Sequence, residues 1–378
     1  MKKVGIITLY RGYNYGSSLQ AYALKAVIRE MGYDAEILWT RENAHSGRDI
    51  RLGKLARIAV RLLIHPGLRK RTIQGYRKSI GIPLELDIKK KFLDFERTEL
   101  DVKGLSRRAL KQYARSDGTQ AIVCGSDQIW SAAVANVEPL YYLRFVPKGK
   151  KVAYAPSFGA SQIPDYNRGI IQKYLSDFPC ISLREAQGAR IVEALTGRRV
   201  PVVLDPTLLL NWEQWKSGQT ESYFLLYFLN EPSEAVVKRI VNLQAREHCR
   251  VYALPYRFAQ YREIPDIVYP SAGPKDFVSL LRNAKCVFTD SFHGTAFSVG
   301  FQVPFWTFAR NYGREVAEQP SRITDFLEML GLRQQYVPAE RIAHLELPEI
   351  DFQTASSILG EQIQFSKAFL REALERAQ

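Results

Sequence analysis

The sequence predicts an α/β protein built from two Rossmann-like halves that face each other across a cleft. Short apolar strands alternate with amphipathic helices, which is the pattern of parallel sheets covered by helices. The 378 residues suffice for two α/β domains of ordinary size. Apolar residues make up 46% and charged residues 24%, a composition typical of a folded, core-forming protein.

The first half is predicted to span residues 1–205. Its strands are expected at 4–10, 35–39, 121–124, 151–155, 180–183 and 200–203, and its helices at 18–31, 165–177 and 185–195. Gly32 is placed to end the first of these helices. A basic insertion of uncertain structure is expected at about 41–115.

The second half is predicted to span residues 206–345, after a hinge in which Pro206 interrupts regular pairing. Its strands are expected at 223–229, 250–254 and 285–289, and its helices at 232–246, 275–283 and 294–300. The last segment, 346–378, has one apolar face at helical spacing, so we expect an amphipathic helix that could pack back on the N-terminal domain. Open α/β sheets bind ligands at the carboxyl ends of their strands, so the polar loops that follow strands are the candidate sites.

Several features predict a cytoplasmic protein. The longest nearly pure apolar run, 223–229, is far shorter than the roughly 20 residues that a membrane span needs. The first residues are interpreted as a core strand rather than a signal peptide. The four cysteines have neither metal-ligand nor redox spacing, so buried, reduced thiols are expected.

The net charge of +14 is concentrated in one segment. Residues 41–115 hold 20 Lys and Arg against 8 Asp and Glu, which suggests an anionic partner: a membrane surface, a nucleic acid or a phosphorylated substrate. Within it, residues 50–64 form a helical pattern with one apolar and one basic face. That pattern fits a helix on an anionic membrane surface, and equally a helix packed on its own protein with a solvated basic face. Nucleic acid is not expected, because aromatics are few and no known module appears.

The loop 11–18 joins the first strand to the first helix. Gly16 permits a tight turn, and the helix amides together with Asn14 and Ser17 could hold an anion. The loop has neither a dinucleotide fingerprint nor a P-loop lysine. A helix cap without a ligand is the alternative.

Two further loops follow strands of the first half. In 124–130, Asp127 and Gln128 could hydrogen-bond to a sugar on which Trp130 stacks; alternatively Asp127 caps a helix and Trp130 lies in the core. Arg184 ends an almost wholly apolar strand, so its guanidinium needs an anionic partner. That partner could be a ligand carboxylate or phosphate, or a protein carboxylate such as Glu185.

The loop 289–295 contains His293, the only one of five histidines at such a strand-to-helix junction. Imidazole is the natural proton donor and acceptor near neutral pH. Ser291, Thr295 and the helix amides could hold a phosphate beside it. No second ligand at a suitable spacing supports a metal site, and no G-x-S-x-G elbow supports a nucleophilic serine.

Seven short motifs, taken together and in order, resemble the polysaccharide pyruvyl transferase family. They are Asn14-Tyr-Gly with Leu19-Gln-Ala-Tyr-Ala23, Gly125-Ser-Asp-Gln-Ile-Trp130, Tyr154-Ala-Pro-Ser-Phe-Gly159, Leu183-Arg-Glu185, Leu204-Asp-Pro-Thr207, Asp290-Ser-Phe-His-Gly294 and Ser321-Arg-Ile323. The resemblance runs from Lys3 to about Leu332. Each motif is weak alone, whereas seven in this order are specific.

The resemblance implies a GT-B-like fold with the active cleft between the halves. It implies phosphoenolpyruvate as the donor substrate, a pair of sugar hydroxyls as the acceptor and a cyclic pyruvate ketal as the product, with no metal or cofactor. By the same resemblance His293 is the general acid/base and Arg184 contacts the donor. In the reaction that we expect from this, Asp127 or Asp290 helps His293 to move protons. Some members carry an arginine where this chain has Ser291, so Arg322, or alternatively Arg310, is expected to supply the missing cation.

The predicted site falls into two groups of residues. The donor is expected to contact Arg184, Asn14, Gly16, Ser17, Ser157, Ser291, Gly294, Thr295 and Arg322. The acceptor, a free or lipid-linked sugar of a cell-surface polysaccharide, is expected to contact Ser126, Gln128 and Trp130. Two alternatives remain open: a glycosyltransferase of the same fold that uses a nucleotide-sugar, and a non-catalytic carbohydrate-binding or assembly protein.

Overall fold

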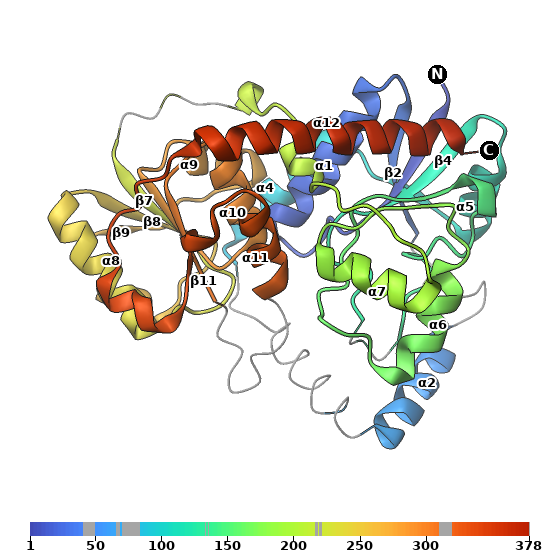
Figure 1. Cartoon of the computed structure of the whole chain (residues 1–378), viewed down its shortest axis with the longest axis horizontal. Coiled ribbons are helices and arrows are strands. Elements are labelled where there is room, and N and C mark those ends of the chain that lie inside the picture. Colours follow the sequence, from blue (N-terminus) through green and yellow to red (C-terminus); the bar gives the residue numbers. More distant parts are fainter. Residues whose placement is uncertain are drawn as a thin grey trace.

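Two parallel six-stranded sheets, each covered by helices, make up the computed structural model (Figure 1). It describes residues 1–40, 50–65, 69, 84–132, 134, 136–215, 218, 221–309 and 320–377. In both sheets the strand order along the sheet, numbered within each half, is 3-2-1-4-5-6, the order of a dinucleotide-binding Rossmann fold. The fold class predicted from the sequence is therefore confirmed.

The first sheet has the order β3-β2-β1-β4-β5-β6. Its strands are β1 (Lys3–Ile7), β2 (Asp34–Thr40), β3 (Lys103–Leu105), β4 (Thr119–Cys124), β5 (Lys151–Ala153) and β6 (Cys180–Ile181). Its helices are α1 (Tyr15–Glu30), α2 (Ile50–Ile64), α4 (Leu86–Phe95), α5 (Arg107–Arg115), α6 (Asp165–Leu175) and α7 (Ala186–Thr196). β1 and β4 are almost wholly buried, because helices cover both faces of a parallel sheet.

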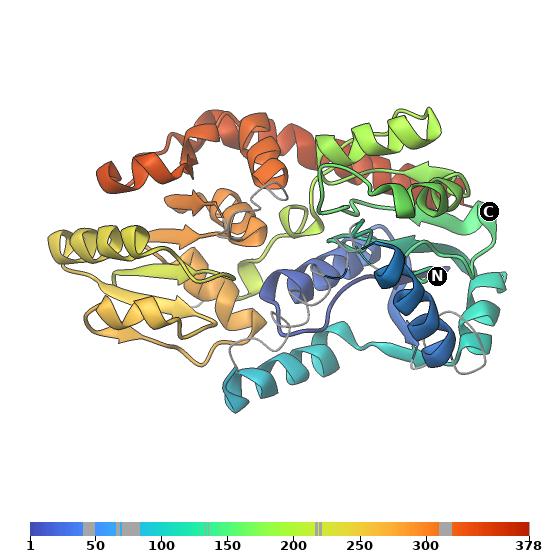
Figure 2. The same ribbon diagram turned by 90° about the horizontal axis from the view of Figure 1, so that it is seen from below.

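The second sheet has the order β12-β11-β10-β7-β8-β9. Its strands are β7 (Tyr223–Tyr227), β8 (Arg250–Leu254), β9 (Ile267–Val268), β10 (Cys286–Thr289), β11 (Phe305–Phe308) and β12 (Tyr336–Val337). Its helices are α8 (Glu234–Glu247), α9 (Pro274–Arg282), α10 (Phe292–Gly300) and α11 (Pro320–Met329). Figure 2 shows the two halves side by side, with the polypeptide linking them near the centre.

Two sequence expectations differ from the structure. The expected basic insertion contains β3, which pairs with β2, so this part of 41–115 belongs to the first sheet. The expected strand at 200–203 is reduced to one bridge between Leu183 and Val202, because the chain is already turning toward the linker. Residues 41–49, 66–68 and 70–83 of the basic segment lie outside the described residues.

The last helix, α12 (Phe352–Arg376), crosses from the second half to the first (Figure 1). On the first half, the side-chain amide of Gln120 donates to the carbonyl oxygens of Leu374 and Ala377, both at 2.8 Å. The Ser366 hydroxyl of α12 accepts from the backbone N–H of Leu204 at 2.9 Å. The final helix therefore fastens the segment that links the two halves.

The start of α1 packs into the second half. The Tyr15 hydroxyl donates to the carbonyl oxygen of Ala272 at 2.9 Å, and the Tyr15 and Phe277 rings stack with centroids 4.7 Å apart. Lys91 on α4 pairs with Asp276 on α9 at 2.8 Å. These contacts join the two halves at the edges of the sheets where the strands have their carboxyl ends.

No helix in the described part of the chain is both long enough and apolar enough to span a membrane.

Candidate active site

Arg184, just after β6, lies at the junction of the two halves. Only 1% of its side chain is exposed, its Nη1 donates to Asp205 Oδ2 at 2.9 Å, and its Nη2 lies 3.5 Å from Asp127 Oδ1. The guanidinium carbon lies 4.5 Å from the ring centre of Phe292, at the start of α10. A buried cation is thus held by two carboxylates of the first half and a ring of the second.

His293 comes from the second half and meets the same carboxylate. Its Nε2 lies 3.6 Å from Asp205 Oδ2, the oxygen that accepts from Arg184 and also from the Ser126 hydroxyl at 2.8 Å. Arg184 and His293 therefore converge on one atom, as a shared site requires. The sequence places each residue at a strand end, and the apposition of the two sheets brings them together.

Asp205 is the residue of this site whose role the sequence analysis missed. The sequence shows it as part of a hinge and of the motif Leu204-Asp-Pro-Thr207, without a role in the site. Its Oδ1 accepts from the backbone N–H of Thr207 at 3.1 Å and from the Thr207 hydroxyl at 2.9 Å. Burial alone would raise the pKa of Asp205, but His293 and Arg184 hold it well below its usual range, so the carboxylate is ionised. A buried arginine needs an anionic partner, and Asp205, an acidic residue directly after an apolar run, could have been considered as that partner from the sequence.

Asp127 links the site to the start of α1. Its backbone has φ +70°, a left-handed conformation that Asp tolerates better than most residues. Its Oδ2 accepts from the Ser17 hydroxyl at 2.7 Å. Burial favours the neutral form, but Arg184 and then His293 outweigh it, so the pKa of Asp127 is lowered. Asp127 is thus an ionised partner of Arg184.

A second arginine, on α11, acts electrostatically on the residue that follows Arg184. Arg322 is buried, and its charge acts on the buried carboxyl of Glu185, which follows Arg184 in the chain. Burial raises the pKa of Glu185, while Arg184, Arg322 and a hydrogen bond with Ser157 act against the increase. Arg322 and Ser157 therefore lie at the same junction as Arg184. Arg310, the alternative cation, lies outside the described residues.

The loop before α1 serves as a helix cap and as a close contact. Asn14 caps α1 by accepting from the backbone N–H of Ser17 at 3.1 Å. A Cβ atom at Gly16 would overlap Nδ1 of His293. Glycine is needed here because α1 of the first half and the imidazole of the second touch at this point.

The polar side chains at the start of α10 form hydrogen bonds within the protein. Ser291 is the N-cap and accepts from the N–H of Gly294 at 3.4 Å, while the hydroxyl of Thr295 lies 2.8 Å from that of Thr307. Both carboxylate oxygens of Asp290 accept backbone N–H groups, those of Leu229 at 2.7 Å and Asn230 at 3.0 Å. Asp290 therefore holds the loop after β7.

The acceptor residues expected in the loop after β4 are placed differently. Trp130 is fully buried, stacks on Tyr142 with centroids 5.2 Å apart and donates to the carbonyl oxygen of Tyr141 at 3.0 Å. The expectation that it stacks on a sugar is wrong, because its indole belongs to the core of the first half. Ser126 is also fully buried, with its hydroxyl on Asp205. Gln128 is half-buried and lies beside Gly159.

A family model described as polysaccharide pyruvyl transferase matches residues 14–312, more than half of the chain. The chain belongs to the polysaccharide pyruvyl transferase family. The resemblance inferred from seven short motifs is thereby confirmed, and the matched region contains Arg184, Asp205 and His293. A search of curated proteins finds no match.

Solved structures with a similar fold are only remotely related to this pyruvyl transferase family member in sequence. A UDP-N-acetylglucosamine 2-epimerase from Rickettsia bellii is 13% identical, with 99% of this chain and 96% of that chain covered and a TM-score of 0.50. MurG from Acinetobacter baumannii is 10% identical, with 99% of each chain covered and a TM-score of 0.45. The first likeness supports the GT-B-like arrangement of the two halves and nothing finer.

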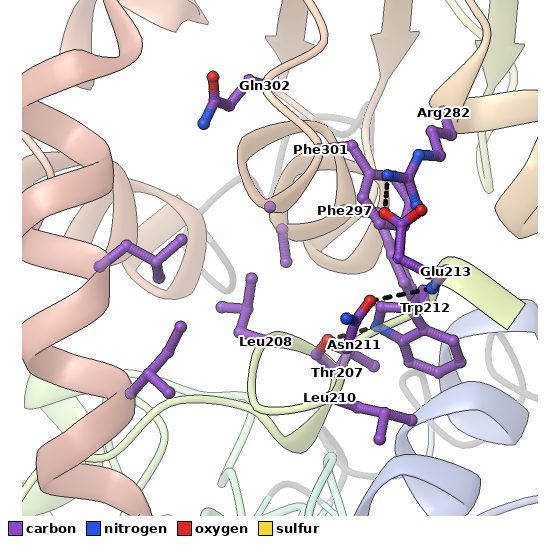
Figure 3. A pocket seen from close by; sticks show the side chains of 14 residues that line it. Thr207, Leu208, Leu210, Asn211, Trp212, Glu213, Arg282, Phe297, Phe301 and Gln302 are labelled. Carbon is purple, nitrogen blue, oxygen red and sulfur yellow. Dashed lines mark hydrogen bonds and ion pairs between the residues drawn. The ribbon is translucent and has the colours of Figure 1, made fainter. Parts of the chain in front are cut away.

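A cavity of about 350 Å³ lies between the linker, the carboxyl end of α10 and α12 (Figure 3). Trp212 donates to the Thr207 carbonyl oxygen at its edge, and Arg282 pairs with Glu213. Neither Arg184 nor His293 lines it, so in this family member the cavity is separate from the charged cluster. Among the described residues, no group of three His, Cys, Asp or Glu could hold a metal ion.

Proposed function

We propose that the chain transfers the pyruvyl group of phosphoenolpyruvate to two hydroxyls of a sugar in a cell-surface polysaccharide precursor. The family supports a pyruvyl transferase. The convergence of Arg184 and His293 on Asp205 Oδ2, at 2.9 and 3.6 Å, carries the proposal, because a three-carbon acid is small. A cation and a proton carrier can act on it only if they share one space.

In the proposed reaction, Arg184 binds the carboxylate of the donor, with Arg322 as the second cation. A proton added to the methylene carbon makes C2 electrophilic, and one sugar hydroxyl attacks it. Phosphate then leaves, and the second hydroxyl closes the ketal ring. Each hydroxyl loses its proton, one proton remains on the methyl group and the other leaves with phosphate or the base. His293 is the residue proposed to move these protons.

The test combines the purified chain, phosphoenolpyruvate and a panel of lipid-linked sugars. Phosphate release and mass spectrometry of the sugar product report the reaction. His293→Ala should lower turnover at least ~10²-fold, as expected for loss of a general acid/base. Near-normal turnover by that variant removes His293 from the mechanism, and nucleotide release from a nucleotide-sugar would favour a glycosyltransferase instead. No turnover with either donor across the panel would favour a non-catalytic carbohydrate-binding protein.

We further propose peripheral contact of α2 with an anionic membrane at the cytoplasmic face, where a lipid-linked acceptor would reside. Arg61 is directed at the protein and donates to Asn167 on α6 at 2.9 Å. By contrast, Val60, Leu63 and Ile64 are 53%, 81% and 65% exposed. Residues 50–84 contain no acidic residue, so apolar exposure and positive charge occur together.

Sedimentation with vesicles tests the membrane contact. Binding to phosphatidylserine vesicles should exceed binding to phosphatidylcholine vesicles and weaken as salt rises. The double variant Leu63→Glu with Ile64→Glu should lose binding, whereas Leu86→Glu, at a 73% exposed leucine on α4, should retain it. Equal binding by all these proteins would exclude α2 as the contact.

A further inference from the structure

We infer that Asp205 is the positioning residue for His293: it fixes which imidazole nitrogen faces the substrate and couples that choice to Arg184. The inference rests on the proposed function, and it concerns a linker residue rather than a strand-end loop. Asp205 Oδ2 accepts hydrogen bonds from Ser126 at 2.8 Å and Arg184 at 2.9 Å, and His293 Nε2 lies at ion-pair distance from it, 3.6 Å away.

The carboxylate of Asp205 is held in a fixed position by its neighbours. Its other oxygen is held by the backbone N–H and hydroxyl of Thr207, and the residue before it is fastened to Ser366 of α12. Asp205 has no exposed side-chain surface and is ionised. A fixed anion therefore stands between the cation of the first half and the imidazole of the second.

The two nitrogens of His293 have different surroundings. Nε2 is buried 3.6 Å from Asp205, and the carboxylate of Asp127 also interacts electrostatically with His293. Nδ1 packs against Gly16 in the first turn of α1, and the N-terminus of a helix favours an anion. An ionised Asp205 favours a proton on Nε2, which leaves the Nδ1 side to exchange protons with the donor. Asp205 thus orients the ring and stabilises the imidazolium formed when Nδ1 takes up a proton.

Asp205→Asn tests this role, because the amide oxygen can still accept from Thr207 while the charge is lost. We expect kcat to fall roughly 10²-fold, because the ring would no longer be held with one nitrogen toward the donor. The control is Asp351→Asn at the start of α12, where Asp351 accepts from the N–H of Gln353 at 2.9 Å in the same local geometry. That variant should keep the wild-type kcat.

A readout without an acceptor separates this inference from the proposed function. In protein with ¹⁵N-labelled histidine, the His293 signals, assigned with His293→Gln, should show the proton of the neutral ring on Nε2, and Asp205→Asn should abolish this preference. An Nδ1–H ring in the wild type, or an unchanged spectrum in Asp205→Asn, overturns the inference. If instead the spectra behave as expected while phosphoenolpyruvate is not consumed, the proposed function fails and the orientation of His293 stands.

Discussion

Arg184→Met removes the guanidinium that lies beside both Asp205 and Asp127 while keeping much of the apolar stem. Arg184 is 1% exposed and its two terminal nitrogens lie 2.9 and 3.5 Å from the two carboxylates. Removing one partner of a buried ion pair costs about 3–5 kcal/mol, because water cannot reach the charges left behind. Both ion pairs share one guanidinium, so their contributions are not added. We expect the free energy of unfolding to fall by about 3–5 kcal/mol in total.

Urea unfolding at several pH values gives the measurement. The loss should be largest near neutral pH and should shrink on acidification, because protonation neutralises the two stranded carboxylates. Arg199→Met is the control: Arg199 is 91% exposed and pairs with Glu193 at 3.0 Å, so about 0–1 kcal/mol is expected. A loss below about 1 kcal/mol for Arg184→Met, or one that does not change with pH, would refute the reasoning.

Three further outcomes follow from the same contacts. The pKa values of Asp205 and Asp127 are lowered by folding, so these carboxylates contribute to the free energy of unfolding above the ordinary Asp pKa near 3.9. This stabilisation is lost as the pH falls through their pKa values in the folded state. Acid unfolding followed by circular dichroism should show the loss, with a weaker pH dependence in Asp205→Asn. Gly16→Ala should lower kcat/KM roughly 10-fold or more, since its methyl group pushes α1 away from His293; unchanged turnover would contradict the close contact. Trp130→Phe should lower stability by about 1–3 kcal/mol in thermal unfolding and leave the KM for the acceptor unchanged, since the indole is core.

The sequence located most elements that have a clear period. The α1 and α8 helices and the β4, β8 and β10 strands fall within a few residues of their predicted ranges, since long apolar patterns report burial directly. β9, β11 and β12 were not predicted; β9 and β12 have two residues each, too few to show alternation. β3 was not predicted, because it lies in the basic segment, where charged residues hide the alternation of a strand.

The sequence by itself determined the alternation of strands and helices, the family motifs, and the placement of Arg184, Asp127 and His293 at strand ends. Only the tertiary structure decided how these side chains meet. The sequence identifies Asp205 as a turn residue, because its hydrogen bond from Thr207 is local. Its hydrogen bond from Arg184 spans 21 residues, and its contact with His293 joins the two halves, so neither can be seen in the local sequence. Trp130 shows the converse, since burial depends on distant Tyr142 and Phe178 packing against it. Local spacing encodes which groups end a strand, but only the packing of one sheet against another sets which of them share an atom.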